Sequence, residues 1–354
     1  MRWGDLMANI MTRMGDGYPV EMSESQVRAD LEAGTQEAAE YANIDPLSKE
    51  ELQYLFDLFK APYRVVGVQP GNEIVLSYDG APLKMMRTAV DVHRMQATQI
   101  YEKLFGADTL ELGHVDYSFK PVKPIVGMEQ TVLEQVSMLT HAPLFYGAMP
   151  NLGLYSEPDG PFPNPAMLLG QGKIKEAQES YELAVEEAVK DIVFVASAMV
   201  ESGADGINLD TVGAAGDADF LAGLKATEIL KAKYPDICIE LGMAGEYVLG
   251  LHAELEYKGQ RLAGMYPQDQ VRMAQEAGVT LFGPVVNVKT NESSPWNLAR
   301  VITFVKACCE VARIPIHANM GMGVGGVPVT NHPPVDITTR ASTAMVEICR
   351  LDGL

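Results

Sequence analysis

Two short segments of the sequence place acidic and amide side chains between aliphatic ones. In GINLDT (206–211), Asn208 and Asp210 alternate with aliphatic residues, and in ICIELGM (237–243) Glu240 is flanked by Ile and Leu. Because side chains along a strand point alternately to opposite faces, the polar set shares one face. A carboxylate in mid-strand is costly to bury unless it is paired or takes part in chemistry. Glu240 is therefore the strongest candidate for a catalytic carboxylate.

The same alternation predicts further residues on the polar face. Glu111 joins Glu240 and Asp210 as an expected catalytic residue. The expected substrate-binding residues are Tyr146, Asn208, Asn287, His317 and Glu246. Two candidates have a structural alternative, since Asp210 could cap the next helix and His317 could be a hydrogen-bonded core residue.

Short apolar segments alternate with amphipathic helices from residue 108 onward. We expect strands at 109–117, 143–149, 206–211, 237–243, 262–266, 280–288 and 314–321. Helices are expected at about 173–202, 217–233, 268–277, 295–312 and 336–350. Strand and helix repeated in this way predict a parallel sheet with crossover helices.

The fold class that this pattern favours is α/β, in the form of a TIM-type (β/α)8 barrel over residues 106–354. Leu351–Leu354 resemble the start of a barrel strand, so we expect the barrel to lack its last strand in this sequence. Barrel enzymes place their chemistry at the carboxyl ends of the strands, where the polar candidates lie. The alternative is an open, seven-stranded doubly wound sheet.

Residues 1–105 have a different pattern and predict an N-terminal α+β appendage. The S-x-x-E/Q spacing of a capping box occurs at 23–26 and 48–51, which predicts helices near 23–40 and 48–60. A hairpin is expected over 64–78, turned at Pro70–Asn72, and a further helix at about 90–105.

The charge balance disfavours several function classes. Among 354 residues, 27 Lys and Arg face 47 Asp and Glu, a net charge of −20. This excess disfavours nucleic acid and anionic membrane surfaces and favours cationic ligands. No apolar run is long enough to cross a bilayer, and the N-terminus is charged where a secretory signal would be apolar, so we expect a cytoplasmic protein. The cysteines have no metal-ligand spacing, and we expect reduced structural thiols and no metal site: Cys238, Cys308, Cys309 and Cys349.

A glycine-rich run, GMGVGG, follows the last expected strand and contains Gly321, Gly323 and Gly325. Such a loop can cradle a phosphate with backbone N–H groups, but no Lys or Arg occurs nearby before Arg340. We expect it to form a tight turn or a docking surface. The sequence also lacks a serine nucleophile elbow, an H-E-x-x-H motif and a Walker loop, so no nucleophile is evident.

Long, unusual strings resemble the dimethylamine:corrinoid methyltransferases of methylotrophic methanogens and some anaerobic bacteria. The likeness extends from about Met14 to Leu354. The strings that carry it are FGADTLELGHVDYSFKPVKP (105–124), PLFYGAMPNLGLYSEPDGPF (143–162), SGADGINLDTVGAAGDAD (202–219), IELGMAGEYVLGLH (239–252), FGPVVN (282–287), SPWNLAR (294–300) and MGMGVGG (320–326).

The resemblance implies that the enzyme contains pyrrolysine, encoded by an in-frame amber codon. In the family, pyrrolysine follows a segment like EI-x-x-x-DGI, which here reads EICRLDGL over Glu347–Leu354. Pyrrolysine is therefore expected immediately after Leu354, and our hypothesis is that the amber codon was read as a stop. The family's N-termini resemble the sequence from Met7, which favours a start at Met7 over Met1.

The resemblance also implies the chemistry. The imine carbon of pyrrolysine could take the nitrogen of dimethylamine, and Co(I) of a corrinoid on a separate, dimethylamine-specific protein would then attack the methyl group. The carboxylates would stabilise the ammonium and supply a proton, and Tyr146 would offer an aromatic face to the cation. No cofactor is expected on this chain itself, the Gly321–Gly326 run could contact the corrinoid protein, and we expect a homo-oligomer.

Three alternatives stay open. One is a barrel lyase that binds a phosphate-bearing ligand at the 321–326 loop. Another is a short, inactive product that only binds the corrinoid protein. Trimethylamine or monomethylamine as the substrate is not excluded by the residues alone, although the strings resemble the dimethylamine branch.

Overall fold

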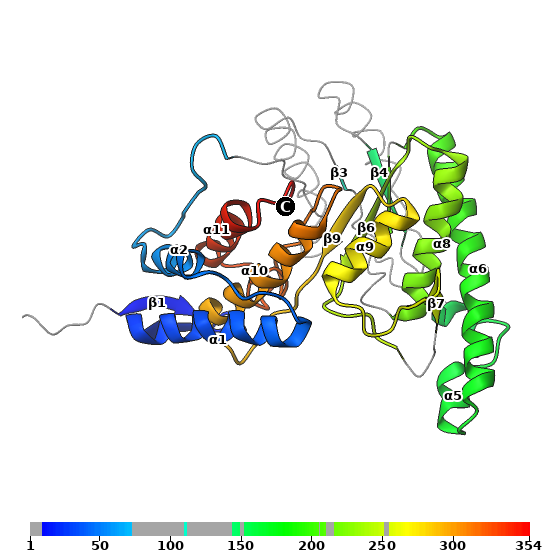
Figure 1. Ribbon diagram of the computed structural model, residues 1–354, viewed down its shortest axis with the longest axis horizontal. Helices are drawn as coiled ribbons and strands as arrows, with labels where there is room; N and C mark the ends of the chain where they lie inside the picture. Colours follow the sequence, from blue (N-terminus) through cyan, green and yellow to red (C-terminus); the bar gives the residue numbers. More distant parts are fainter. Residues whose placement is uncertain are drawn as a thin grey trace, which may run out of the picture.

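The computed structural model describes residues 9–72, 110–111, 144–148, 152–204, 206–209, 216–250 and 255–354. Figure 1 shows one parallel sheet with helices packed beside it. The expectation of an α/β fold built on a parallel sheet is confirmed.

The sheet contains, within the described residues, five parallel strands that lie in the order of the sequence. They are β3 (Leu110–Glu111), β4 (Leu144–Ala148), β5 (Gly206–Leu209), β6 (Cys238–Ala244) and β9 (Leu281–Pro284). Single bridges continue this order beyond β9, because Phe282 pairs in parallel with Ile316 and His317 with Gly353. In the sheet, the strand expected over 314–321 is thus reduced to the pairing residues Ile316 and His317. Five other expected strands are present, within their expected bounds or one residue beyond them.

The expectation of a strand over 262–266 is wrong. This segment follows a small antiparallel hairpin of β7 (Glu256–Tyr257) and β8 (Gln260–Arg261), and it forms a turn. Gly264 adopts the left-handed conformation at φ 85°, and its N–H donates to the Val248 carbonyl at 2.7 Å. Leu262 is fully buried, so the apolar pattern reflects burial and not pairing in the sheet.

Crossover helices connect the strands, and all five that the sequence predicts are present. They are α6 (Ile174–Glu201), α8 (Asp217–Lys233), α9 (Pro267–Ala277), α10 (Ser294–Val311) and α11 (Val335–Ala344), which continues as the π-helix η3 (Met345–Cys349). The short helices η2 (Leu152–Tyr155) and α5 (Pro165–Gly170) precede α6. Along the chain α6 contacts α8, α8 contacts α9, and α9 contacts α10. The helices therefore follow one another in the same order as the strands.

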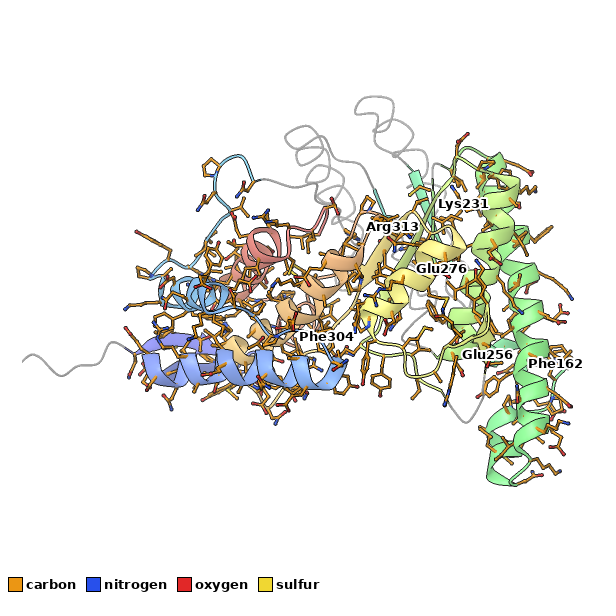
Figure 2. The ribbon with its side chains drawn as sticks, in the orientation of Figure 1. Phe162, Lys231, Glu256, Glu276, Phe304 and Arg313 are labelled. Carbon is orange, nitrogen blue, oxygen red and sulfur yellow. The ribbon has the colours of Figure 1, made fainter. Side chains whose placement is uncertain are left out.

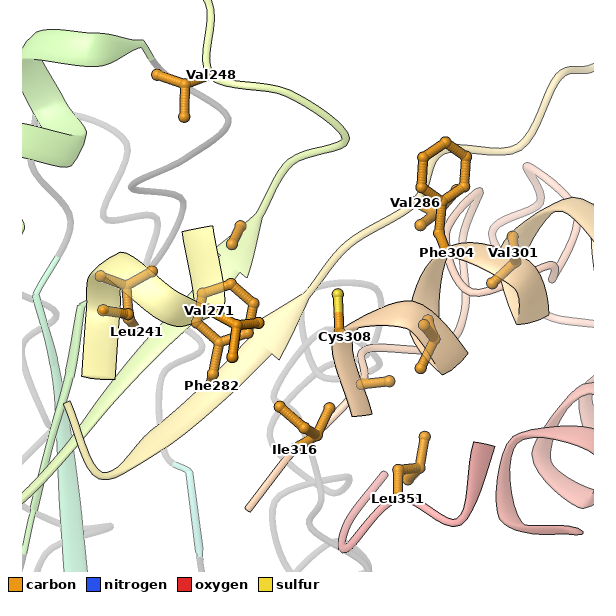
Figure 3. Close-up of a cluster of buried hydrophobic side chains, with 14 of the residues drawn as sticks. Leu241, Val248, Val271, Phe282, Val286, Val301, Phe304, Cys308, Ile316 and Leu351 are labelled. Atoms are coloured by element: carbon orange, nitrogen blue, oxygen red, sulfur yellow. The ribbon is translucent and has the colours of Figure 1, made fainter. Parts of the chain in front are cut away.

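The core lies between the sheet and these helices. Leu241 and Phe282 project from neighbouring strands towards Val271 of α9, and Ile316 lies near Cys308 of α10 (Figure 3). Each of these side chains is at most 1% exposed. Burial of a large aliphatic or aromatic side chain contributes about 1.5–3 kcal/mol, so this layer fixes which face of each strand meets the helices.

The N-terminal region forms the hairpin β1 (Ile10–Arg13) and β2 (Pro19–Met22), followed by α1 (Glu24–Ala42) and α2 (Lys49–Lys60). Both predicted capping boxes are present, at Ser23 and Ser48. Helix α1 packs along α10, where the side-chain oxygens of Thr35 and Thr303 are 2.8 Å apart.

The hairpin predicted over 64–78 is wrong in its described half. The turn at 70–71 is present, and Asn72 N–H donates to the Gln69 carbonyl at 3.0 Å. Residues 64–69 form no strand, because this segment bonds to side chains of the last helices instead: Val66 N–H donates to Thr339 and Gln69 N–H to Glu347. Residues 73–78 and the helix expected at 90–105 lie outside the described residues.

Candidate functional site

Asn208 and Glu240 are neighbours across two adjacent strands. The register of β5 and β6 pairs them directly, and both residues are buried, at 4% and 8% exposure of the whole residue. Paired residues of parallel strands share a face, and the flanking aliphatic residues occupy the helix-facing side. The structure therefore brings these two candidates together on the face of the sheet opposite the helices, as the alternation predicts. We call this face the inner face.

Glu240 contacts His317, which lies on the segment beyond β9. His317 Nδ1 and Glu240 Oε1 are 3.0 Å apart, and the two side chains are 14% and 10% exposed. The His317 N–H donates to the Phe282 carbonyl at 2.9 Å, which fixes the histidine backbone against β9. A carboxylate that holds one imidazole nitrogen sets the orientation of the ring and stabilises its charged form. The pair can therefore accept or supply a proton and can balance a positive charge.

Gly283 lies on the strand between these two residues. A Cβ built at Gly283 would be 3.5 Å from Glu240 Oε1 and 3.1 Å from the His317 carbonyl oxygen. The glycine thus leaves the carboxylate and the imidazole room to meet across β9. Sequence reasoning did not single out this position, although a glycine inside a strand often marks a close approach of backbone or ligand.

Gly242 has a similar relation to Asn208. A Cβ at Gly242 would be 2.8 Å from Asn208 Oδ1, closer than real Cβ contacts. The absence of a side chain lets the Asn208 amide lie across β6, next to Glu240. Among the described residues, Asn208 Oδ1 is a buried acceptor without a hydrogen-bond donor.

Glu246 belongs to a separate network of charged groups. It forms a two-point ion pair with Arg300, whose Nε also contacts Glu37 at 2.6 Å, and Lys289 contacts Glu37 at 2.5 Å. Burial raises the pKa of Glu37, but hydrogen bonds from Lys289 and Arg300 outweigh it and hold that pKa below its ordinary value. Asn287 joins this network through its backbone, because its N–H donates to Glu246 Oε1 at 2.9 Å. In the described part of the chain no hydrogen bond links these residues to the Glu240–His317 pair.

The glycine-rich loop uses its backbone amides within the protein. The N–H groups of Gly321, Gly323 and Gly325 donate to the carbonyls of Val324, Val327 and Val286 at 3.1–3.2 Å. A phosphate cradle needs such N–H groups to point at the ligand. The loop is therefore a tight turn locked against the segment after β9, as the sequence suggests.

Three candidates are only partly described or lie outside the described residues. Asp210 lies outside them. Glu111 is described through its backbone, which pairs with Phe145. In the register of β4 and β5, Tyr146 pairs with Ile207 and Gly147 pairs with Asn208. The residue of β4 that lies in register with Asn208 is therefore Gly147 and not Tyr146.

Asp217, at the start of α8, is a buried carboxyl that sequence reasoning missed. It is 4% exposed, and its Oδ2 has no hydrogen-bond partner among the described residues. Burial raises the pKa of Asp217 to about 6, against the opposing effects of backbone hydrogen bonds and Arg261. Its signal in the sequence, the acid after GAAG, is the same as that of an ordinary helix start.

Within the described residues no cluster of three His, Cys, Asp or Glu side chains is placed to hold a metal ion. No helix of that part of the chain combines the length and the apolar character needed to cross a bilayer.

Comparison with known families identifies the chain. The family model described as dimethylamine methyltransferase matches residues 8–354. This match spans the inner-face residues and nearly the whole sequence, and it confirms the resemblance seen in the sequence strings. The chain therefore belongs to the dimethylamine methyltransferase family, a family of methyltransferases of methylamine metabolism and methanogenesis.

Proposed function

We propose that this chain transfers a methyl group from dimethylamine to the Co(I) corrinoid of a separate corrinoid protein. The corrinoid supplies the nucleophile, and pyrrolysine supplies an electrophilic imine carbon for the amine nitrogen. Family membership supports the reaction. The single structural observation that carries the site is the buried Glu240–His317 contact of 3.0 Å on the inner face of the sheet.

The residues of the chain would act on the charge and the protons of the amine. Dimethylamine is mostly protonated at neutral pH and must lose a proton before its nitrogen can form a bond. In this proposal the Glu240–His317 pair takes that proton. When the nitrogen becomes cationic again, the Glu240 carboxylate balances its charge in a site of low polarity, which favours formation of the substituted ammonium from which the nucleophile then takes the methyl group.

We further propose that pyrrolysine follows Leu354. The support comes from the register: Gly353 pairs with His317, and alternate residues of a strand share a face. A residue at the second position after Gly353 would lie on the same side as His317. Reading the gene beyond codon 354 tests this proposal. An amber codon followed by an open frame, with an intact native mass above that of 354 residues, would support it, and an ochre or opal codon would contradict it.

A closed (β/α)8 barrel over residues 106–354, with residues 1–105 as an appendage, is the fold that we propose for the enzyme. Strands in sequence order and helices that contact their successors support it. The doubly wound alternative reverses its strand order at a switch point, and the described strands run in one order throughout.

The test of the function is Glu240→Gln in the full-length enzyme produced with amber suppression. We expect kcat/KM for dimethylamine-dependent methylation of the Co(I) corrinoid to fall by about 100-fold or more, as for loss of an acid–base group. Glu256→Gln is the matched control, because Glu256 is an exposed carboxylate on the short strand β7, labelled in Figure 2. Normal methyl transfer by Glu240→Gln would contradict the assignment.

The phosphate-binding lyase has less support, since the loop amides that it needs are used by protein carbonyls. The non-catalytic binder is tested by expressing the 354 residues alone: a chain that melts cooperatively and binds the corrinoid protein but transfers no methyl group would favour it.

A further inference from the structure

The inner face holds a buried acceptor that the methyl transfer steps above do not use. Asn208 is 4% exposed, and its buried Oδ1 receives no hydrogen bond from any described residue. A buried carbonyl without a donor is destabilising, and native proteins keep few of them. A ligand N–H at this position would satisfy the oxygen.

A second acceptor lies beside the first. Glu240 is the register partner of Asn208, and its Oε1 is engaged by His317 while its Oε2 has no partner among the described residues. No Lys or Arg of the described chain forms an ion pair with Glu240. The two side chains therefore offer acceptors and a negative charge, which is the chemistry that recognises a cation with N–H donors.

Gly242 determines where the first acceptor lies. Because a Cβ at this position would be 2.8 Å from Asn208 Oδ1, any side chain at 242 would displace the amide from its place across β6. With glycine, the oxygen of Asn208 stays over the same strand that carries Glu240. The glycine is thus a positioning residue for the acceptor.

We propose that Asn208 Oδ1 and Glu240 Oε2 form a two-acceptor subsite for the two N–H groups of dimethylammonium, positioned by Gly242, and that this subsite selects the secondary amine. The inference rests on the proposed function, since it names how that site recognises its substrate. Trimethylammonium has one N–H and leaves one acceptor unpaired. Methylammonium has three N–H groups, so one of them finds no acceptor in the subsite. A buried group left unpaired lowers affinity, so the selectivity should be at least about 10-fold.

The experiment measures binding and turnover separately in the full-length enzyme. Affinities for dimethylammonium, trimethylammonium and methylammonium chlorides are measured by calorimetry without the corrinoid protein, and kcat/KM is measured with it. In Asn208→Leu we expect dimethylammonium to bind about 10-fold more weakly and the preference over trimethylammonium to shrink by a similar factor. Asn208→Asp keeps an acceptor and should retain the preference.

Two further variants make the result decisive. Gly242→Ala leaves Asn208 in the chain but displaces its oxygen, and it should lose the same preference even if Asn208→Leu does not fold. Ser197→Ala removes another buried, unpartnered oxygen, on α6, and should leave the preference unchanged. An unchanged preference in folded Asn208→Leu or Gly242→Ala overturns the subsite.

The two proposals can fail independently. If the wild-type enzyme binds dimethylammonium with this selectivity but transfers no methyl group, the function is wrong and the subsite stands. If it transfers the methyl group and the variants keep wild-type selectivity, only the subsite is wrong.

Discussion

Arg300 of α10 and Glu246, just after β6, face each other in a two-point ion pair that lies almost entirely out of solvent. The guanidinium is 3% exposed and the carboxylate 13%. Burial lowers the pKa of Arg300, but the hydrogen bonds and charges of Glu246 and Glu37 outweigh it and raise that pKa. The same guanidinium lies 5.0 Å from the ring centre of Phe304, which Figure 2 labels beside α1. One side chain thus links α10, α1 and the end of β6.

Arg300→Met should be strongly destabilising, because it leaves the carboxylates of Glu37 and Glu246 without their buried partner. The expected loss is about 3–5 kcal/mol in the free energy of unfolding, measured by urea titration. Arg272→Met is the control, since the Arg272–Asp269 pair is exposed and its loss should cost less than about 1 kcal/mol. Equal effects of the two variants would contradict a structural role for the network.

Asp217→Asn should stabilise the protein in a pH-dependent manner. Burial raises the pKa of Asp217 to about 6, above the ordinary value of about 3.9. The folded state therefore keeps a proton that the unfolded state releases, so the favourable contribution is complete below about pH 4 and is lost as the pH rises through 6.

The measurement for Asp217→Asn is the free energy of unfolding at pH 4 and at pH 7.5. We expect a gain on the order of 1–3 kcal/mol at pH 7.5 and little change at pH 4. Asp236→Asn, at an exposed position, should show no such difference between the two pH values. A gain for Asp217→Asn that is the same at both pH values would show that ionisation is not its cause.

Gly34→Ala should separate α1 from α10. A Cβ at Gly34 would be 2.1 Å from the carbonyl oxygen of Trp296, and a backbone atom cannot move aside alone. We expect a loss of about 1–3 kcal/mol, seen as a lower melting temperature. Gly170→Ala is the matched control, because a Cβ there meets no atom within 4 Å and should be neutral or stabilising. Similar melting temperatures for both variants would show that the helices tolerate the added methyl group.

His317→Ala should impair catalysis more than folding. Loss of the imidazole removes the group that Glu240 orients, and kcat/KM for methyl transfer should fall by about 100-fold. The assay is methylation of the Co(I) corrinoid by the full-length enzyme, with His332→Ala as a control at an exposed histidine. A folded His317→Ala enzyme with wild-type kcat/KM would assign the histidine to the core, the alternative that the sequence leaves open.

The capping boxes and the strand faces could be predicted because their causes are local. Ser23 and Ser48 need only the residue three positions later, and the alternation around Glu240 needs only its own strand. The meeting of Glu240 with His317 could not be predicted, since 77 residues separate them and the contact depends on strand order and on Gly283 between them.

Other errors have the same origin in distant contacts. Residues 64–69 have the composition of a strand. Two of their backbone N–H groups instead donate to the side chains of Thr339 and Glu347, which take the place of a partner strand. The ion-pair network of Glu246 could not be predicted from the sequence either, because Arg300 and its second partner Glu37 come from helices that only the folded chain brings together.

The N-terminal hairpin is held by some of the most distant residues of the chain. Arg13 Nε lies 2.9 Å from Asp336, 323 positions away, and the Val329 N–H donates to the Gly15 carbonyl at 2.8 Å. Bringing together two segments this far apart in the sequence has a large cost in chain entropy, which opposes the formation of these bonds. During synthesis the hairpin can therefore form these bonds only after the segment that contains Val329 and Asp336 has emerged.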